Sequence, residues 1–143
     1  MAISNTLSNN FKRALMNKEV DMDTDVFKIA LMGTSFVFDP ALHGEWADVA
    51  ASEIASGNGY STGGQTLLSG ELTQNDVTNK GVMSWANAEW TAVGGDIADT
   101  GAAVIFDDTH ADKVILGCSD FGVNYSTIEG MSLKFVSVIL NLG

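Results

Sequence analysis

Three aspartates at alternate positions, Asp21, Asp23 and Asp25, could bring carboxylates together around one cation. A calcium-binding loop that begins in this way also needs a glycine at its sixth position and a bidentate glutamate at its twelfth. The chain has Val26 and Met32 at those two positions. We therefore predict a solvated turn that leads into a strand, rather than a metal site.

The segment Gly59–Thr66 has the glycine spacing of a phosphate-binding loop. Gln65 occupies the position where such a loop places the lysine that neutralises the phosphate charge, and no buried strand is predicted just before it. The glycines are better explained as turn positions with a left-handed backbone conformation.

The other reactive side chains do not form a convergent set in the sequence. His43 and His110 fall in separate predicted loops, and Cys118 lies in a predicted strand as a small buried residue. Asp107 and Asp108 could form an acid–base pair, but adjacent residues of a strand point to opposite faces. We therefore expect no catalytic, cofactor-binding or metal-ligating residues, and a protein that is not an enzyme.

The composition is acidic, with 18 Asp and Glu against 7 Lys and Arg in 143 residues. Acidic and basic residues balance over residues 1–28, so the rest of the chain carries the whole net charge of −11. Such a surface repels phosphate, which argues against nucleic acid as a partner. No apolar stretch is long enough for a bilayer, and a single cysteine excludes an internal disulfide. We expect synthesis in a reducing cytoplasm and no membrane partner.

The first element is predicted to be a helix over about residues 4–18, because Leu7, Phe11 and Leu15 recur at four-residue spacing. The period then changes to that of a strand over residues 26–32, where Phe27, Ile29 and Leu31 share one face. A long excursion over about residues 33–63 follows, and excursions of this length are usually functional or interfacial.

Short strands separated by turns occupy the remainder of the chain. They are predicted at 65–73, 81–86, 88–93, 101–106, 113–119 and 131–142. Several short strands after one helix indicate a mainly β domain over residues 1–143, an antiparallel β-sandwich or barrel preceded by an N-terminal α-helix.

Three tryptophans are the large aromatic anchors of the chain. Trp85 lies in an alternating strand and is predicted to be in the core. Trp46 lies in the excursion, so it is the stronger candidate for a protein interface, although packing within the monomer is the more common fate of such a residue.

A series of short motifs in collinear order covers nearly the whole chain and resembles small structural proteins of tailed bacteriophages. These motifs are Phe11-Lys12-Arg13-Ala14-Leu15, the run Val20 to Leu31, His43-Gly44-Glu45-Trp46-Ala47-Asp48-Val49, Glu53-Ile54, the run Gly57 to Leu67, Ser84-Trp85-Ala86-Asn87-Ala88, Ala103-Val104-Ile105-Phe106-Asp107-Asp108-Thr109 and Asp120-Phe121-Gly122. The stretch 89–99 departs from the usual pattern. Each motif alone is a turn signature, so the specificity lies in their order.

Some proteins of this group resemble capsid cement or decoration proteins, which implies a jelly-roll-like β-sandwich on the capsid exterior of the virion. The resemblance implies two partners, the major capsid protein and further copies of the chain as a dimer or trimer. The expected function is to stabilise the shell against the pressure of packaged DNA.

Two other functions remain open from the sequence. A tail or neck component would fit the same resemblance with a different copy number. A carbohydrate-binding β-sandwich would require Trp46, Trp90 or Tyr60 to line up exposed on one face.

Overall fold

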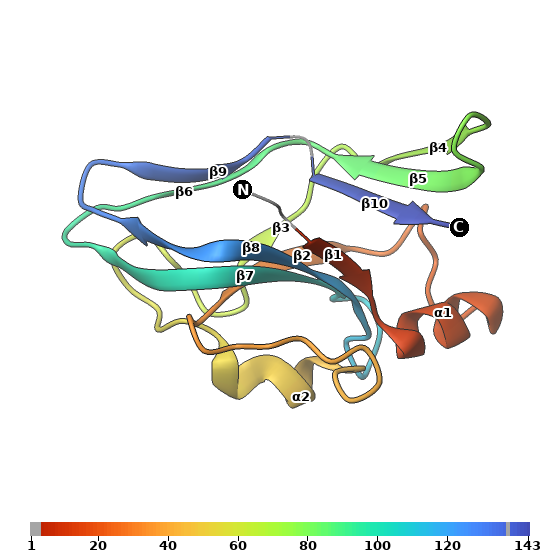
Figure 1. The fold of residues 1–143 in the computed structure, drawn as a ribbon, viewed down its shortest axis with the longest axis horizontal. Coiled ribbons are helices and arrows are strands. Elements are labelled where there is room, and N and C mark those ends of the chain that lie inside the picture. The colour runs from red at the N-terminus through yellow and green to blue at the C-terminus, as the bar shows by residue number, and fades with distance from the viewer. Residues whose placement is uncertain (1–3, 137) are drawn as a thin grey trace.

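The computed structural model describes residues 4–136 and 138–143 and is mainly β, with every strand pair antiparallel (Figure 1). This confirms the predicted fold class. The elements in chain order are β1 (Ser4–Leu7), α1 (Asn9–Met16), β2 (Phe27–Met32), α2 (Trp46–Val49), the 3-10 helix η1 (Ala50–Ser52), β3 (Gln65–Thr66), β4 (Glu71–Asn75), β5 (Lys80–Trp85), β6 (Ala88–Thr91), β7 (Ile97–Asp107), β8 (Ile115–Thr127), β9 (Ser132–Phe135) and β10 (Val138–Leu142).

The predicted helix over residues 4–18 is wrong at its start, because residues 4–7 form a strand. Leu7 pairs with Gly117 of β8, so its four-residue spacing to Phe11 is not helical. Ser8 begins the helix, since its side-chain oxygen accepts hydrogen bonds from the backbone N–H groups of Asn10 and Phe11. The helix therefore starts where a capping side chain can satisfy its first N–H groups.

The strands form two layers. The larger sheet has the order β1-β8-β7-β2-β3, and the smaller sheets have the orders β10-β5-β4 and β6-β9. Figure 1 shows the two smaller sheets end to end above the larger one. Together they make the second layer of an antiparallel sandwich.

The main core lies between these layers. It takes Phe27, Ile29 and Leu31 from one face of β2, as their alternation predicts. Trp85 also belongs to this core, which confirms its prediction. From α1, Phe11 and Ala14 complete the packing at one end.

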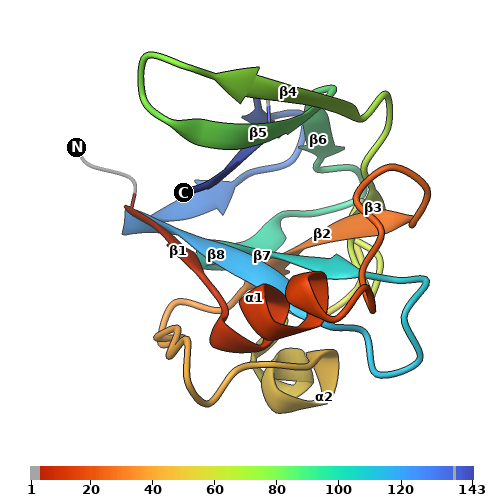
Figure 2. The same cartoon turned by 90° about the vertical axis from the view of Figure 1, so that its right-hand side faces the viewer.

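The opposite face of the larger sheet is also buried. Its core comprises Ala30 and Met32 of β2 with apolar residues of β7 and β8, and Phe36, Phe38 and Trp46 pack on it. Figure 2 shows α2 beneath the larger sheet and the second layer above it. The excursion after β2 therefore supplies a third layer, which the sequence pattern did not predict.

Several predicted strands have different boundaries in the structure. The predicted strands 65–73 and 131–142 are each divided in two, into β3 and β4 and into β9 and β10. The predicted strand 101–106 is part of the longer β7, and residues 115–119 of the predicted strand 113–119 begin the longer β8; β7 and β8 pair as one long hairpin. A turn residue such as Gly130 is a local signal that can be recognised in the sequence. The lengths of β7 and β8 depend instead on their pairing with each other, which a local pattern does not show.

One edge of the sandwich is closed by a side chain. Gln65 of β3 accepts a hydrogen bond from the backbone N–H of Glu89 in β6 and donates one to the carbonyl of the same residue. The side-chain amide thus links the two layers as the backbone of a strand would.

Candidate interaction surfaces

The excursion is held in place by backbone hydrogen bonds to its neighbours. Asn9 N–H donates to the Pro40 carbonyl at 3.0 Å, and the Asn10 side chain donates to the Gly44 carbonyl at 3.0 Å. The Trp46 N–H donates to the Lys113 carbonyl at 2.9 Å. The excursion is therefore fastened to α1 and to the segment before β8.

A small aromatic cluster shapes the first half of the excursion. The rings of Phe36 and Phe38 lie 5.3 and 5.6 Å from the ring of His43, measured between centroids. The His43 imidazole accepts a hydrogen bond from the Asp39 N–H at 2.9 Å, which identifies its Nδ1 as the unprotonated nitrogen. His43 thus has a packing and hydrogen-bonding role in the loop.

This arrangement turns two large apolar side chains outward. Val37, between the two phenylalanines, is 80% exposed, and Leu42 is 69% exposed. Because the loop is fixed, these side chains are presented without the ordering cost that a loose loop would have. We name Val37 and Leu42 the excursion patch.

Trp46, the interface residue singled out in the sequence, is half-buried at the start of α2. Its ring stacks on that of Phe106 with 4.4 Å between centroids, so much of the side chain packs within the monomer. Sequence reasoning missed Val37 and Leu42, which belong to the same excursion. The alternation Phe36-Val37-Phe38 is the signal that could have shown one outward residue between two inward ones.

The alternating aspartates form a turn, as predicted. The Asp21 carboxylate accepts hydrogen bonds from the N–H groups of Asp23 and Thr24 at 2.9 and 3.2 Å, and these bonds lower its pKa. The Asp25 carboxylate accepts from the Asp21 N–H at 3.0 Å. Within the described parts of the chain, no group of three potential metal-ligating side chains is present.

The glycine-rich segment folds around a carboxylate of the chain itself. Glu53 accepts hydrogen bonds from the Gly63 N–H at 2.6 Å and from the Tyr60 hydroxyl at 2.7 Å. Gly59 and Gly64 have φ of +104° and +74°, which confirms the left-handed turns expected there. Burial raises the pKa of the Tyr60 hydroxyl, which also accepts the Leu31 N–H.

The other reactive residues occupy separate environments. Cys118 is buried, as predicted, and burial raises the pKa of its thiol to about 12. Asp107 is buried, whereas Asp108 forms an ion pair with Lys113. His110 approaches Glu19 at 3.9 Å and thus lies in a different cluster from His43.

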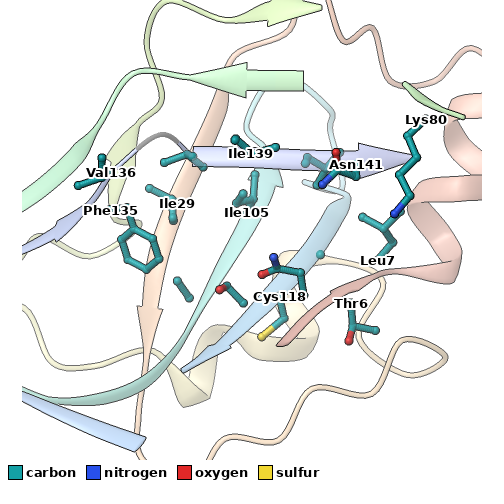
Figure 3. Close-up of a pocket in the computed structure, with 16 residues that line it drawn as sticks. Thr6, Leu7, Ile29, Lys80, Ile105, Cys118, Phe135, Val136, Ile139 and Asn141 are labelled. Carbon is teal, nitrogen blue, oxygen red and sulfur yellow. The ribbon is translucent and has the colours of Figure 1, made fainter. Parts of the chain in front are cut away.

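A cavity of about 640 Å³ opens between the layers (Figure 3). Its walls come from β1, β2, β7 and β8 of the larger sheet and from β5, β9 and β10 of the second layer. Sixteen residues line it, and Lys80 is the one charged residue among them. Figure 3 shows Ile29 and Ile105 at its base and Ile139 and Asn141 along β10.

Comparisons with protein-family models, with curated proteins and with solved structures find no match to this chain. Among residues 4–136 and 138–143, no helix has the length and apolar character needed to cross a membrane.

Proposed function

We propose that this chain is a structural virion protein of a tailed bacteriophage, a capsid cement or decoration protein on the outer capsid surface. The proposal is carried by the collinear resemblance that extends over nearly the whole chain. The excursion patch supports it, because Val37 and Leu42 are exposed on a fixed loop. An apolar pair presented in this way suits docking on another protein. The proposed partners are the major capsid protein and further copies of the chain.

The proposed mechanism is thermodynamic linkage. A protein that bridges neighbouring capsid subunits makes contacts that exist only in the assembled shell. It therefore lowers the free energy of that state, as a ligand stabilises the state to which it binds. Each contact can be weak, because many copies act together on one particle. The net charge of −11 suits an outer position, away from the packaged genome.

A tail or neck component remains the alternative of the same class. Such components form rings of fixed symmetry, so the number of copies per virion distinguishes the two roles. The carbohydrate-binding alternative has less support, because Trp90 and Tyr60 are buried and form no aromatic platform with Trp46.

The test uses shells of the encoding phage that lack this protein, incubated with the purified chain and sedimented. We expect the wild-type chain to sediment with the shells and to raise the temperature at which they open. The double variant Val37→Asp/Leu42→Asp should lose binding by at least tenfold. Val77→Asp is the matched control, because Val77 is 92% exposed in the turn after β4.

Two results would contradict the proposal. The first is a folded wild-type chain that does not sediment with the shells at any concentration. The second is a virion that contains the chain only in the few copies of a tail or neck ring. Equal binding by the Val37→Asp/Leu42→Asp variant would reject the excursion patch as the contact and leave the capsid assignment standing.

A further inference from the structure

We propose that the cavity between the layers binds a single-chain anionic amphiphile, such as a fatty acid, with its alkyl chain between the sheets and its carboxylate on Lys80. A small-molecule site of this kind goes beyond the proposed function. It is tested with purified protein and a soluble ligand, so its outcome is independent of any binding to shells.

The first step is that the cavity leaves part of the main core open. Leu7, Ile105 and Phe135 pack against that core but are only partly buried, and all three line the cavity. The volume of about 640 Å³ lies in the range of small-molecule sites and is far larger than one water molecule. Because protein interiors are normally close-packed, an alkyl chain would supply contacts that these side chains otherwise lack.

The second step is that the lining changes in character along the cavity. Figure 3 shows Phe135 and Val136 at one end and Lys80 with Asn141 at the other. The first end suits an apolar tail. The second suits a charged head group, which can bind the ammonium group of Lys80 and remain in contact with water. The site therefore matches a molecule that is apolar at one end and charged at the other.

The third step is charge, which sets the sign of the head group. After its first 28 residues the chain has three lysines and 14 acidic residues. Lys113 forms an ion pair with Asp108, and Lys134 lies opposite Glu89 in the β6–β9 pair. Lys80 forms no ion pair with any residue that the structure describes, and it is the one charged residue of the lining. An anion is therefore the ligand that this end of the cavity attracts.

The number of charges limits the class of anion. Lys80 offers a single positive charge on a flexible stem, which matches one carboxylate. A nucleotide or another polyphosphate would need several cationic side chains, and the lining supplies only this one. The net charge of −11 also opposes a ligand with several negative charges. A monoanionic amphiphile is thus favoured over a polyanion.

The first test is calorimetric titration of the chain with octanoate, decanoate and dodecanoate, each below the concentration at which it aggregates. We expect the affinity to rise about tenfold for each two added methylenes as the tail fills the cavity. Decyltrimethylammonium carries the same tail with a positive head group and should bind more weakly than decanoate. This comparison is stringent, because the chain as a whole attracts cations.

The variant Lys80→Met removes the charge and keeps a flexible side chain. It should weaken decanoate binding about fivefold, the upper value for an exposed ion pair. It should not weaken the binding of decyltrimethylammonium. Lys134→Met is the matched control, because it removes the same charge from a residue that does not line the cavity. Decanoate should bind to this control as it does to the wild-type chain.

Methyl NMR locates the ligand and remains informative if Lys80→Met does not fold. The methyl signals of Ile29 and Ile105 should shift saturably with decanoate, because both residues line the cavity. Those of Ile115 should not, because Ile115 is buried on the opposite face of the larger sheet. Absence of binding, or saturation without shifts at Ile29 and Ile105, would overturn the proposal; a cavity covered by a second copy of the chain would give this result. Wild-type binding of decyltrimethylammonium as tight as that of decanoate would also overturn it.

Discussion

The carboxyl group of Asp107 is buried against that of Asp25, where β7 ends and β2 is about to begin. One oxygen of Asp107 accepts the N–H groups of Thr109 and His110, at 2.9 and 3.3 Å. Of the described residues, none donates a hydrogen bond to its other oxygen. Burial and the Asp25 carboxyl raise the pKa of Asp107 to about 7. The Asp107 carboxyl group therefore stays protonated in weakly acidic solution.

From the raised pKa of Asp107 we predict that its contribution to the free energy of unfolding falls as the pH rises. The pKa of Asp107 is higher in the folded chain than its ordinary value of 3.8, so the folded state binds the proton more tightly. The contribution is fully present below about pH 4 and is lost progressively up to about pH 7. Denaturant titrations across this range should show the decline, after correction for the groups with lowered pKa values, Glu19 and Asp21.

The variant Asp107→Asn isolates that effect. An asparagine keeps the oxygen that accepts the Thr109 and His110 N–H groups and supplies an amide that can donate to Asp25. We expect the variant to be more stable than wild type at pH 8, by on the order of 2 kcal/mol. Its stability should also change less between pH 5 and pH 8. Asp112→Asn, at an exposed position, is the control and should follow the wild-type profile.

A second prediction concerns the glycine turn at Gly64. Its φ is +74°, and a β-carbon there would lie 1.9 Å from the backbone carbonyl oxygen of Ile29. Gly64→Ala should therefore destabilise the chain by about 3 kcal/mol or more, since the obstructing atom belongs to the backbone of β2. Gly94→Ala separates the cost of a positive φ from the cost of a steric clash, because Gly94 has φ of +80° with open space around it. That change should cost only about 1 kcal/mol, as measured by chemical denaturation.

A third prediction concerns the closed edge of the sandwich. Gln65→Leu preserves the approximate size of the side chain and removes both hydrogen bonds to Glu89. We expect a loss of about 1–2 kcal/mol, the usual net value of two hydrogen bonds at a partly exposed site. Gln74→Leu removes an exposed side-chain hydrogen bond to Asp76 and should change the free energy of unfolding much less. Equal effects of both variants would show that Gln65 does not link the layers.

A fourth prediction separates the two possible roles of Trp46. Because the indole stacks on Phe106, Trp46→Ala should lower the free energy of unfolding by about 2 kcal/mol. Leu42→Ala, at an exposed position of the excursion patch, should leave stability nearly unchanged. Binding to shells must then be compared at a temperature at which both variants are folded. A loss of binding with Leu42→Ala alone would assign the contact to the patch.

The strands were predictable where alternation and packing agree. In β2, Phe27 and Ile29 enter the core between the layers, and the period of two residues is visible in the sequence. The start of α1 was not predictable in the same way. Leu7 and Phe11 have helical spacing, but the pairing of Leu7 with Gly117 joins segments far apart in the chain. A local pattern contains no information about such a partner.

The candidate surfaces depend still more on tertiary structure. Trp46 was chosen as an aromatic residue in the excursion, yet its burial depends on the position of Phe106, which belongs to β7. Val37 and Leu42 are ordinary apolar residues in the sequence, and only the packing of the excursion shows that they face solvent. The cavity beside β10 likewise depends on how the layers pack, and composition does not reveal which strand is at an edge.

The larger sheet is covered by side chains on both faces, and this cover determines how its backbone amides exchange with solvent. The backbone amides of β2 and β7 are shielded from water by side chains above and below, so their deuterium uptake should require unfolding of the entire domain. In β4 every side chain is exposed, and its amides should exchange through brief local detachment from β5. A chain built in this way can release β4 repeatedly while the amides of β2 and β7 keep their original protons.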